Sequence, residues 1–528
     1  MKSYLRLTFS LLCGLLASRV TAAEIITADV CIYGGTAGGV AAAVEAARLG
    51  KTVVLVEFGA HLGGMSSGGL SQTDIGNKGA IGGISREFYQ RMGRHYGKEE
   101  QWSFEPSVAE AIFFQLVNEA KVPVYFHQHL DSVKKKQARI VEIVMENGKI
   151  FRARMFIDAT YEGDLMGRAG VSYTIGRESN SQYQETLDGI RPQTPKHQFV
   201  VPVDPYVKPG DPASGLLPLI QAGDGGIPGA GDHAVQAYNF RMCLTQNREN
   251  QRPIEPPAKY NPARYELLAR YVEALVAAGK PPKLGELMHI QPMPNGKTDI
   301  NNNGAFSTDF IGANYDYPDA SYPRRAQIWQ EHVDYMRGFF HFLATSPRLP
   351  ESLRQEMQSW GLAKNEFCDT GGWPHQLYVR EARRMISDYV MTELNCRAST
   401  QLPDAIGLAA YTMDSHNCQR IVKNGHVENE GDTQVGGFPP YPISYRSIIP
   451  KASECENLLV PLCLSSTHIA YGSIRMEPVF MVLGQSAAAA ACQAIKKKVP
   501  VQKISIAKLQ TQLLVEHQIL EWRGNSLK

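Results

Sequence analysis

The feature that most constrains the fold is a run of glycines between two apolar segments near the N-terminus. Ala28–Tyr33 reads ADVCIY, the glycines of GGTAGG follow, and KTVVLVE closes the segment at Glu57. Short apolar runs bounded by glycines are typical of buried parallel strands, and the alanine-rich VAAAVEAARL between them predicts a helix close to the sheet. Gly50 follows this helix, where a glycine commonly ends one. The segment therefore predicts a complete β-α-β unit.

This unit departs from the dinucleotide-binding pattern G-x-G-x-x-G at one position. Gly34 allows the tight turn and Gly39 the close contact of helix and strand, but Thr36 stands where bare backbone normally meets the diphosphate. Two neighbouring glycines partly offset this substitution. Glu57 follows the first glycine by about 20 residues, the distance at which an acid meets the adenosine ribose. The residues assigned to this nucleotide site are Gly34, Gly35, Thr36, Gly38, Gly39 and Glu57.

A second region rich in glycine and serine favours FAD over NAD. HLGGMSSGGLSQTDIGNKGAIGG follows the first unit, where a nicotinamide-binding unit would continue to another helix and strand. The flavin nucleotide is longer and needs further main-chain contacts. FIDATYEGD ends an apolar run, and GQSAAAAA is expected to open a helix whose N-terminus stabilises negative charge on reduced flavin. These segments add the expected FAD ligands Gly63, Gly64, Met65, Ser66, Asp158, Ala159, Thr160, Gly163, Asp164, Glu477, Gly484, Gln485 and Ser486.

The chain resembles a family of exported bacterial FAD-dependent oxidoreductases, often labelled xanthan-lyase-related. The segments that carry the resemblance are YGGTAGGVAAA, HLGGMSSGGL, FIDATYEGDLMGRAGVSYTIGRES, VQAYNFRMCLT, PNGKTDINNNGAFSTDFIG, QLYVREARRM, YTMDSHNCQR and AYGSIRMEPVFMVLGQSAA. The resemblance implies bound FAD and a Rossmann-like domain of the glutathione-reductase type, without a settled substrate. The flavin part is also similar to heterodisulfide-reductase A-like proteins, but no C-x-x-C spacing is present, so their iron–sulfur clusters are not expected.

The flavin motifs lie at both ends of the chain, with a segment of different composition between them. Residues 24–180 and 445–528 are assigned to the FAD-binding domain, and residues 181–444 to an inserted α+β substrate or cap domain. ARYELLARYVEALVAAG and PRRAQIWQEHVDYMRGFFHFLA have the apolar spacing of helices, and so does SIAKLQTQLLVEHQIL near the C-terminus. The predicted fold class is α/β, with the inserted domain packed over the flavin.

Residues 1–23 have the features of a secretory signal peptide. Lys2 and Arg6 precede an apolar run from about Leu7 to Ala17, which is too short to span a bilayer, and small residues follow it. The mature protein is therefore expected to be periplasmic or secreted, without stable membrane insertion. No twin-arginine signal is present, so FAD would be acquired after export. A net charge of +2 gives no indication of a nucleic-acid partner.

Hydride transfer to a flavin needs a base for the substrate proton and a group that steadies charge near the ring. His468 shortly precedes the C-terminal flavin motif, and His416 lies in the polar run MDSHN; for each, a structural histidine remains the alternative. Arg475 and Glu477 adjoin the same motif and are expected to form an ion pair against the flavin, in a structural or a catalytic role. The predicted catalytic residues are His468, His416 and Arg475.

Three polar segments of the insert are less decisive. Asn239 and Arg241 lie among aromatic residues, in reach of either the flavin ring or the substrate. The arginines of YVREARRM have helical spacing, which favours a solvated helix face paired with Glu381. DINNNG begins like a calcium loop, but Phe310 stands where the bidentate acid belongs, so its asparagines are expected to serve a loop and no metal site is predicted.

Together these patterns predict an exported FAD-dependent oxidoreductase that moves a hydride between a small polar substrate, a sugar or polyol, and flavin N5. Only one dinucleotide unit is visible and no haem or cluster motif is present, so an external electron acceptor is expected rather than NAD(P)H. Two alternatives remain open. One is a redox-neutral flavin-dependent lyase, and the other is a carbohydrate-processing or carbohydrate-binding protein that carries a structural flavin.

Overall fold

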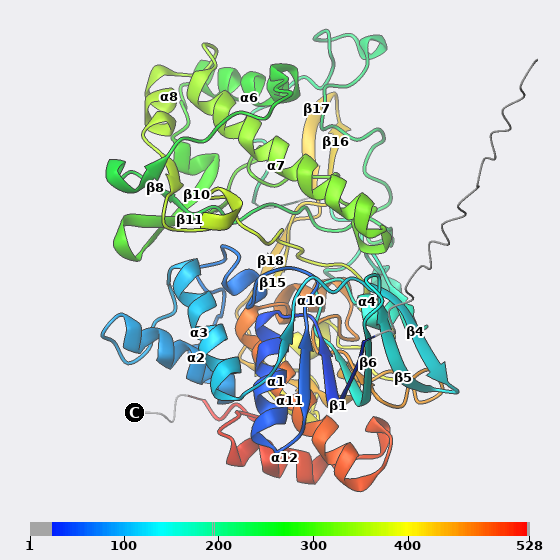
Figure 1. The fold of residues 1–528 in the computed structure, drawn as a ribbon. Helices are drawn as coiled ribbons and strands as arrows, with labels where there is room; N and C mark the ends of the chain where they lie inside the picture. Colours follow the sequence, from blue (N-terminus) through cyan, green and yellow to red (C-terminus); the bar gives the residue numbers. More distant parts are fainter. Residues whose placement is uncertain (1–23, 193, 195, 525–528) are drawn as a thin grey trace, which may run out of the picture.

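The computed structural model describes residues 24–192, 194 and 196–524. The predicted signal peptide lies outside the described residues. Figure 1 shows an upper part, which contains most of the middle of the chain, and a lower part, in which the N-terminal and C-terminal segments lie together. The two ends of the chain therefore build one structural unit, as the distribution of flavin motifs predicts. The domain limits themselves stay a prediction.

A seven-stranded sheet forms the centre of the lower part. Its strands are β1 (Ile25–Tyr33), β2 (Val53–Val56), β3 (Val124–Tyr125), β4 (Leu130–Lys136), β5 (Arg139–Met145), β6 (Ile150–Asp158) and β20 (Leu458–Leu459). Their order is β3-β2-β1-β6-β5-β4, and β20 pairs with the end of β6. The strands β3, β2, β1, β6 and β20 are parallel, whereas β5 and β4 form an antiparallel extension. A mixed α/β fold with a parallel sheet is thus confirmed.

The β-α-β unit has the predicted form, with α1 (Ala37–Arg48) between β1 and β2. The register sets Tyr33 beside Val56 on one side and beside Asp158 on the other. Because parallel strands end at the same edge of a sheet, the turn after β1, the acid after β2 and the segment after β6 meet at this edge. Open α/β sheets bind their ligands at the carboxyl ends of their strands, so this edge is where the site is expected.

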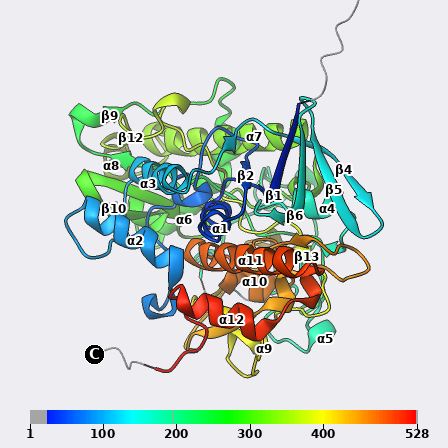
Figure 2. The same ribbon diagram turned by 60° about the horizontal axis from the view of Figure 1, so that its bottom comes forward.

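Two long helices cross at glycines on one face of this sheet. In Figure 2, α1 lies beside α11 (Glu477–Lys497). A Cβ atom at Gly484 would lie 2.0 Å from the carbonyl oxygen of Gly38, and one at Gly38 would lie 2.8 Å from the carbonyl oxygen of Phe480. The helix α11 is long and apolar enough to cross a membrane, but 94% of its most apolar stretch of 18 residues is buried inside the protein. Its alanines therefore serve close helix packing.

Shorter helices complete the lower part, as Figures 1 and 2 show. They are α2 (Gly83–His95), α3 (Pro106–Glu119), α4 (Asp164–Arg168), α5 (Asn180–Tyr183), α9 (Glu393–Cys396), α10 (His468–Ile474) and α12 (Ile506–Val515). The helix expected near the C-terminus is confirmed as α12, which packs against α11. Leu509 and Leu513 of α12 are fully buried, so this helix docks the end of the chain onto the lower part.

The upper part contains a five-stranded antiparallel sheet with the order β10-β11-β8-β12-β9. Its strands and helices are β8 (Leu244–Thr245), β9 (Gln251–Arg252), β10 (Met288–Met293), β11 (Lys297–Asn302), β12 (Gly361–Ala363), α6 (Glu266–Ala277), α7 (Tyr322–Thr345) and α8 (Glu351–Gln358). The two helices expected in the insert are confirmed as α6 and α7. The loop expected for the asparagines of DINNNG is partly wrong, because Asn301 and Asn302 pair with β10 in a hairpin.

The described residues also form small two-stranded sheets. They are β7 (Tyr173–Thr174) with β13 (Arg384–Met385), β14 (Ala405–Ala409) with β19 (Tyr441–Ser444), β15 (Met413–Ser415) with β18 (Thr433–Val435), and β16 (Gln419–Lys423) with β17 (His426–Glu430). In Figure 1, β15 and β18 lie at the level where the upper and lower parts meet. The side chains that β15 carries are therefore close to both parts.

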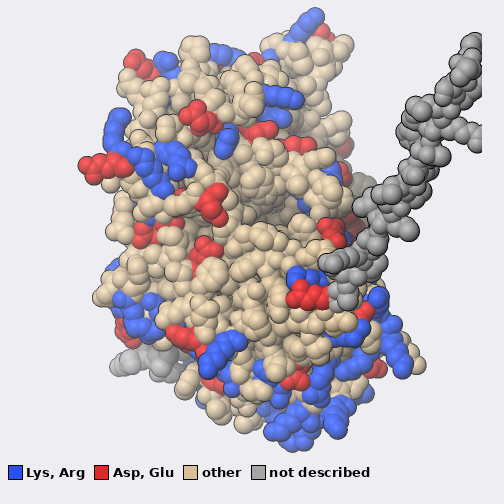
Figure 3. Space-filling view, viewed as in Figure 1, with Lys and Arg blue, Asp and Glu red and all other residues tan. Residues whose placement is uncertain are grey.

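The surface charge is mixed, with a basic group at one edge of the main sheet. Figure 3 shows Lys and Arg side chains gathered at the lower right of this face, where Figure 1 shows β4 and β5 and, below them, the segment that follows α11. Lys134 and Arg152 both bind Glu142 at 2.7 Å, which neutralises part of the group. The cationic side chains of both pairs are exposed, and ion pairs at the surface contribute little to stability.

We predict that Gly484→Ala lowers the free energy of unfolding by about 1–3 kcal/mol, because the added methyl group forces α11 away from α1. Thermal or urea denaturation measures the effect. Gly285→Ala is the matched control, since a Cβ atom there meets nothing within 4 Å. Equal stability of the two variants would contradict the close crossing.

Candidate functional site

Thr36 replaces the second glycine of the nucleotide pattern without strain. Its backbone is extended, with φ −63° and ψ 171°, a conformation that any residue adopts. The Thr36 hydroxyl accepts a hydrogen bond from the N–H of Gly39 at 3.1 Å and donates one to the carbonyl oxygen of Ala159 at 2.8 Å. Thr36 is therefore the N-cap of α1 and ties the start of this helix to the end of β6.

The glycines on either side of Thr36 have the roles expected from the pattern. Gly34 has φ +108°, and a Cβ atom there would lie 2.6 Å from the carbonyl carbon of Ala159. A Cβ atom at Gly39 would lie 1.9 Å from the carbonyl oxygen of Gly34. The turn thus needs glycine at both positions, for the left-handed backbone and for the close contact of helix and strand.

A narrow cleft of about 100 Å³ lies at this edge of the sheet. The Glu57 carboxylate faces it and accepts the N–H groups of Gly35 and Gly59, each at 2.5 Å. Burial raises the pKa of Glu57 to about 7. The cleft is lined by Gly35, Thr36, Glu57, Phe58, Gly59, Ala60, His61, Gly64, Tyr161, His375 and Gln376. Bare backbone, a helix N-terminus and an acid next to the second strand fit the adenosine diphosphate part of FAD.

Glu477 connects the N-terminus of α11 to the second glycine-rich region. Its carboxylate accepts the hydroxyl of Tyr161 at 2.7 Å and that of Ser66 at 3.2 Å. The Tyr161 oxygen in turn accepts the N–H of Met65 at 2.8 Å. Burial raises the pKa of Glu477 to about 7. Four predicted ligands, Gly63 to Ser66, therefore lie in one short segment that Tyr161 and Glu477 hold beside the cleft.

The expected ion pair between Arg475 and Glu477 is wrong. Arg475 donates to the Tyr378 hydroxyl at 2.9 Å and to Asp414 at 3.1 Å. The chain turns between α10 and α11, with Met476 as the N-cap of α11, and this turn separates the two side chains. Arg475 therefore belongs to a second cluster of polar side chains, with Tyr378 and Asp414. It lies two positions before Glu477, which is the first residue of α11.

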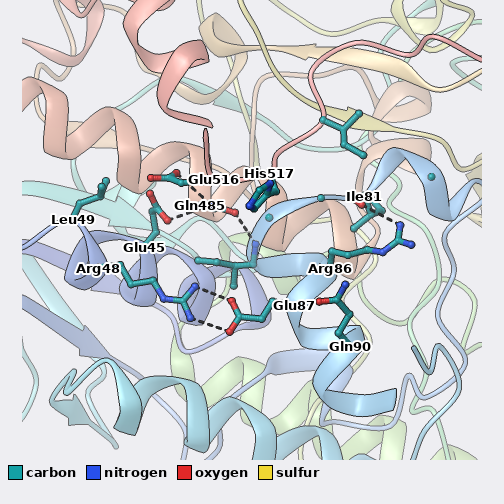
Figure 4. Close-up of a pocket in the computed structure, with 15 residues that line it drawn as sticks. Glu45, Arg48, Leu49, Ile81, Arg86, Glu87, Gln90, Gln485, Glu516 and His517 are labelled. Carbon is teal, nitrogen blue, oxygen red and sulfur yellow. Dashed lines mark hydrogen bonds and ion pairs between the residues drawn. The ribbon is translucent and has the colours of Figure 1, made fainter. Parts of the chain in front are cut away.

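The prediction that Gly484, Gln485 and Ser486 open a helix is also wrong, because α11 already begins at Glu477. Figure 4 shows Gln485 beside both Glu45 and Glu516, and its amide nitrogen lies 3.2 Å and 3.4 Å from their carboxylates. The Ser486 hydroxyl donates to a backbone carbonyl of β14 at 2.7 Å. These residues pack α11 against its neighbours, and none of them lines the cleft.

The residues that follow β6 bond chiefly to one another. Asp158 accepts the hydroxyl of Thr160 at 2.7 Å and the N–H of Met166 at 2.7 Å, and burial raises its pKa to about 6. The Thr160 oxygen accepts the N–H of Gly163 at 3.0 Å. These three predicted ligands thus build the turn into α4. Ala159 differs from these residues, because its backbone lies against the nucleotide turn at Gly34.

Asp164 links the lower part to the upper part. Its carboxylate binds Arg325 of α7 at 2.6 Å and Arg383 at 2.9 Å. Burial raises the pKa of Asp164, but the two guanidinium groups outweigh burial and hold that pKa below its ordinary value. Breaking one partner of such a buried pair is costly, so Asp164 has a structural role here.

Asp414 lies in β15, and His416 directly follows the end of this strand. The Asp414 carboxylate is 3.1 Å from Nη2 of Arg475 and 3.5 Å from Nε2 of His416, and Nδ1 of His416 is 2.8 Å from Asp309. Burial lowers the pKa of the His416 imidazole and Arg380 lowers it further, but the two carboxylates outweigh them and raise it above 6.5. Burial raises the pKa of Asp414, but His416 and Arg475 bring it down to about 2. His416 is thus a titratable base with both ring nitrogens oriented.

Further contacts close these side chains into a ring. Asp309 is 3.0 Å from Nη2 of Arg380, and the Arg380 guanidinium lies 4.5 Å from the ring centre of Tyr378. The Tyr378 hydroxyl accepts a hydrogen bond from Arg475, which completes the ring. The guanidinium of Arg241 lies 5.8 Å from the same aromatic ring and binds Asp299. We call this the charged ring, and its members are Arg475, Asp414, His416, Asp309, Arg380 and Tyr378.

Several buried polar atoms near His416 have no hydrogen-bond partner among the described residues. They are Nδ1 of His197, Nδ2 of Asn417, Oδ1 of Asp432 and Oγ1 of Thr433. Burial lowers the pKa of His197 to about 4 and raises that of Asp432 to about 7. Buried polar groups are costly when they are unpaired. A bound molecule with polar groups would supply the missing partners.

His468 lies deeper than His416. Its Nδ1 is 2.7 Å from Glu381 and its Nε2 is 2.9 Å from the Ser415 hydroxyl, and only 2% of the residue is exposed. Both ring nitrogens are therefore engaged away from solvent. Of the two histidines predicted as catalytic, the structure sets only His416 in the charged ring.

The solvated helix expected for YVREARRM is wrong. The segment forms no helix and ends in β13, and Arg380, Arg383 and Arg384 are all buried. Each guanidinium meets a carboxylate from a distant part of the chain, which helical spacing cannot reveal. Glu381 does pair with Arg384, at 2.6 Å. Asn239 bonds to Asn301 and Thr308 within the upper part.

The sequence did not single out Asp309, Tyr378 and Tyr161 as site residues. Asp309 and Tyr378 lie in segments without a glycine pattern, and Tyr161 lies inside the FIDATYEGD motif as one aromatic residue among many. Their hydrogen bonds to Glu477, His416 and Arg475 join residues that are between 97 and 316 positions apart in the chain. No local signal in the sequence indicates these pairs.

The family follows from comparison with known proteins. A family model described as FAD dependent oxidoreductase matches residues 29–513. The chain belongs to the FAD-dependent oxidoreductase family. The protein is thus an FAD-dependent oxidoreductase with FAD as its cofactor, in agreement with the nucleotide cleft. A search of curated proteins gave no match.

Solved structures of flavoenzymes are similar to part of the chain. They include a flavin-containing monooxygenase from Stenotrophomonas maltophilia (19% identity, 29% of this chain, 43% of that chain, TM-score 0.20), a 3-ketosteroid-delta4-(5alpha)-dehydrogenase from Rhodococcus jostii RHA1 (16%, 29%, 50%, 0.20) and THI4 from Thermovibrio ammonificans (19%, 29%, 66%, 0.23). The chain thus spans less than two thirds of each. Similarity at this level says nothing about the substrate.

We predict that Thr36→Val loses FAD and lowers the free energy of unfolding by about 0.5–2 kcal/mol, because valine cannot accept the N–H of Gly39. Thr36→Ser keeps the hydroxyl and is expected to behave like the parent protein. Flavin absorbance after gel filtration and the melting temperature measure the two effects. Full FAD content in Thr36→Val would show that the cap does not support the nucleotide turn.

His61 joins the two parts of the protein at the cleft. Its Nδ1 is 2.9 Å from Glu110 and its Nε2 is 3.2 Å from Asp369, and its ring stacks on His375 with 3.8 Å between centres. Burial lowers the pKa of His61, but Glu110, Asp369 and Glu57 outweigh it and raise that pKa above 6.5. The protonated ring therefore holds both carboxylates.

We predict that FAD is released faster as the pH rises through the raised pKa of His61. Because the pKa is raised in the folded protein, the stabilisation is complete below 6.5 and is lost above the folded value. The increase of flavin fluorescence after dilution, followed between about pH 6 and pH 9, measures the release. His61→Gln should remove this dependence, whereas His289→Gln, at an exposed site, should retain it. The same pH profile in both variants would exclude this role of His61.

Proposed function

We propose that the protein oxidises a small hydroxylated substrate, a sugar or polyol, and passes the electrons to an external acceptor. The observation that carries this proposal is the orientation of His416 between Asp309 and Asp414, beside buried polar atoms without partners. Arg475 connects this cluster to the flavin residues, because it binds Asp414 and stands two positions before Glu477. A base and a polar binding region therefore adjoin the residues that would hold FAD.

His416 would act as the base. Asp309 accepts from Nδ1–H, and Nε2, which lies 3.5 Å from the Asp414 carboxylate, would take the proton of a substrate hydroxyl group. Bound FAD supplies a two-electron acceptor for the hydride of the adjacent C–H bond. The alcohol becomes a carbonyl compound, the proton stays on His416, and the external acceptor receives both electrons in a later step. Arg475 and Arg380 hold the two aspartates in place throughout.

Substrate recognition would use the unpartnered atoms near His416. His197 and Asn417 offer nitrogen atoms, and Asp432 and Thr433 offer oxygen atoms, so donors and acceptors are both present. A sugar or polyol carries hydroxyl groups that donate and accept in the same way. The redox-neutral lyase and the carbohydrate-binding protein would use the same atoms, and the experiment below separates all three.

We predict that the flavin band of the protein bleaches when a member of a sugar and polyol panel is added without oxygen. His416→Asn should slow this bleaching by a factor of about 10²–10⁴, the usual contribution of a general base. Before substrate is added, His416→Asn should have the same flavin spectrum and the same amount of bound FAD as the parent protein. Turnover without bleaching would support the lyase. Binding with neither turnover nor bleaching would support the carbohydrate-binding alternative.

The pH dependence gives an independent measure of the same base. The bleaching rate should rise with pH through the raised pKa of His416, because only the neutral imidazole accepts a proton. Asp309→Asn removes one of the charges that raise this pKa, so the profile should move to lower pH. An unchanged profile in Asp309→Asn would mean that another group is the base.

Export is part of the proposal and is supported by the signal-like residues 1–23. The inserted segment, residues 181–444, would then act as the substrate domain, since it supplies Asp309, Tyr378 and His416. N-terminal sequencing of the protein recovered from culture medium or periplasm tests export directly. An intact N-terminus in the cytoplasmic fraction would overturn it.

A further inference from the structure

A chain of three polar side chains lies behind β15, the strand that contains Asp414 and ends one residue before His416. The Ser415 hydroxyl is 2.9 Å from Nε2 of His468, whose Nδ1 is 2.7 Å from the Glu381 carboxylate. This order of serine, histidine and carboxylate has the geometry of a nucleophilic triad. Ser415 and Glu381 are fully buried and His468 is 2% exposed, however. No substrate reaches this serine, so the three residues have another use.

The direction of the side chains on β15 indicates this use. Successive residues of a strand point to opposite faces. Asp414 and His416 contact each other on one face, where Arg475 and Asp309 also lie. Ser415 points to the other face and meets His468. The hydrogen bond to Ser415 therefore holds the strand from behind, at the residue between the two members of the charged ring.

Glu381 also reaches the next residue of the strand by a second route. The amide nitrogen of Gln236 donates to the Glu381 carboxylate at 2.8 Å, and the amide oxygen of Gln236 accepts the backbone N–H of His416 at 3.0 Å. One arm thus runs through His468 to Ser415, and the other through Gln236 to His416. Both arms begin at the same buried carboxylate.

Glu381 is itself fixed on a third side. Arg384 donates to its other oxygen at 2.6 Å, and the same guanidinium binds Glu178 at 2.6 Å. Glu178 accepts the backbone N–H of His468 at 2.9 Å. Burial raises the pKa of Glu381, but His468 and Arg384 outweigh it, so the group stays ionised. Gln236, Arg384 and His468 all bond to this carboxylate. Hydrogen bonds to a charged acceptor are strong, so the Glu381 side chain has little freedom to move.

We propose that Glu381 is a positioning residue that sets the orientation of His416 through two arms, Gln236 on one side and His468 with Ser415 on the other. This inference rests on the proposed role of His416 as the base. A base works only when its nitrogen faces the substrate hydroxyl within hydrogen-bond distance. His468, predicted as catalytic from its position in the sequence, acts in this arrangement through Ser415 and touches no reacting atom.

The experiment removes each arm separately and both together. Ser415→Ala deletes the first arm, Gln236→Leu the second, and the double variant deletes both. Each single variant should lower the kcat for anaerobic bleaching about tenfold with KM changed less than about twofold, and the double variant about a hundredfold, the scale of a misplaced catalytic group. Ser447→Ala is the matched control, because this buried hydroxyl donates one hydrogen bond of 2.7 Å to a backbone carbonyl outside the charged ring.

A spectroscopic readout separates positioning from general destabilisation. The pKa of His416, followed by NMR of the labelled imidazole without substrate, should fall in Ser415→Ala and in Gln236→Leu, because a displaced ring loses contact with Asp309. It should stay at the parent value in Ser447→Ala. If Gln236→Leu does not fold, Gln236→Met serves instead, since its side chain also spans the site without donating.

The outcomes distinguish the inference from the proposed function. An unchanged His416 pKa and unchanged kcat in Ser415→Ala and Gln236→Leu would overturn the positioning role while leaving His416 as the base. Full activity in His416→Asn would overturn the proposed base. The pKa measurement would then still report whether the two arms orient the ring, because it requires no turnover.

Discussion

The contact between Gly38 and Gly484 is the constraint on which the rest of the structure depends. The backbone of α11 comes so close to α1 that a single methyl group at Gly484 would lie 2.0 Å from a carbonyl oxygen. This approach fixes both helices on the sheet. The N-terminus of α1, with its cap Thr36, then faces the nucleotide cleft, and the N-terminus of α11 brings Glu477 to Tyr161 and Ser66. Segments from the two ends of the chain meet at one cofactor site.

Buried charge joins this flavin unit to the rest of the protein. Arg475 lies just before α11, yet its partners Tyr378 and Asp414 come from the middle of the chain. Asp164 likewise binds Arg325 of α7 and Arg383. A buried ion is tolerated only when it is paired and hydrogen-bonded, so these pairs fix how the two parts meet. The pair of Arg475 with Asp414 also contacts His416, so the role that we propose for this histidine depends on how the two parts meet.

Local patterns in the sequence predicted those elements whose cause is local. The β-α-β unit follows from two apolar runs, glycines and an alanine-rich segment, and α6, α7 and α12 follow from apolar residues at helical spacing. The predictions failed where the cause is a distant partner. GQS was expected to open a helix because small residues follow it, but the small residues serve the contact with α1. YVREARRM has helical spacing, but its arginines are extended toward carboxylates that lie far away in the chain.

The sequence by itself determined the cofactor and the architecture that holds it. Glycines at Gly34 and Gly39 and an acid at Glu57 are requirements of backbone geometry and hydrogen bonding within one β-α-β unit, so they are visible as spacing. Only the tertiary structure decided which histidine adjoins the charged ring, which carboxylates surround it, and that His468 lies behind the strand. The physical reason is that the pKa and orientation of a side chain depend on charges within a few ångströms. Here those charges come from segments that the sequence keeps far apart.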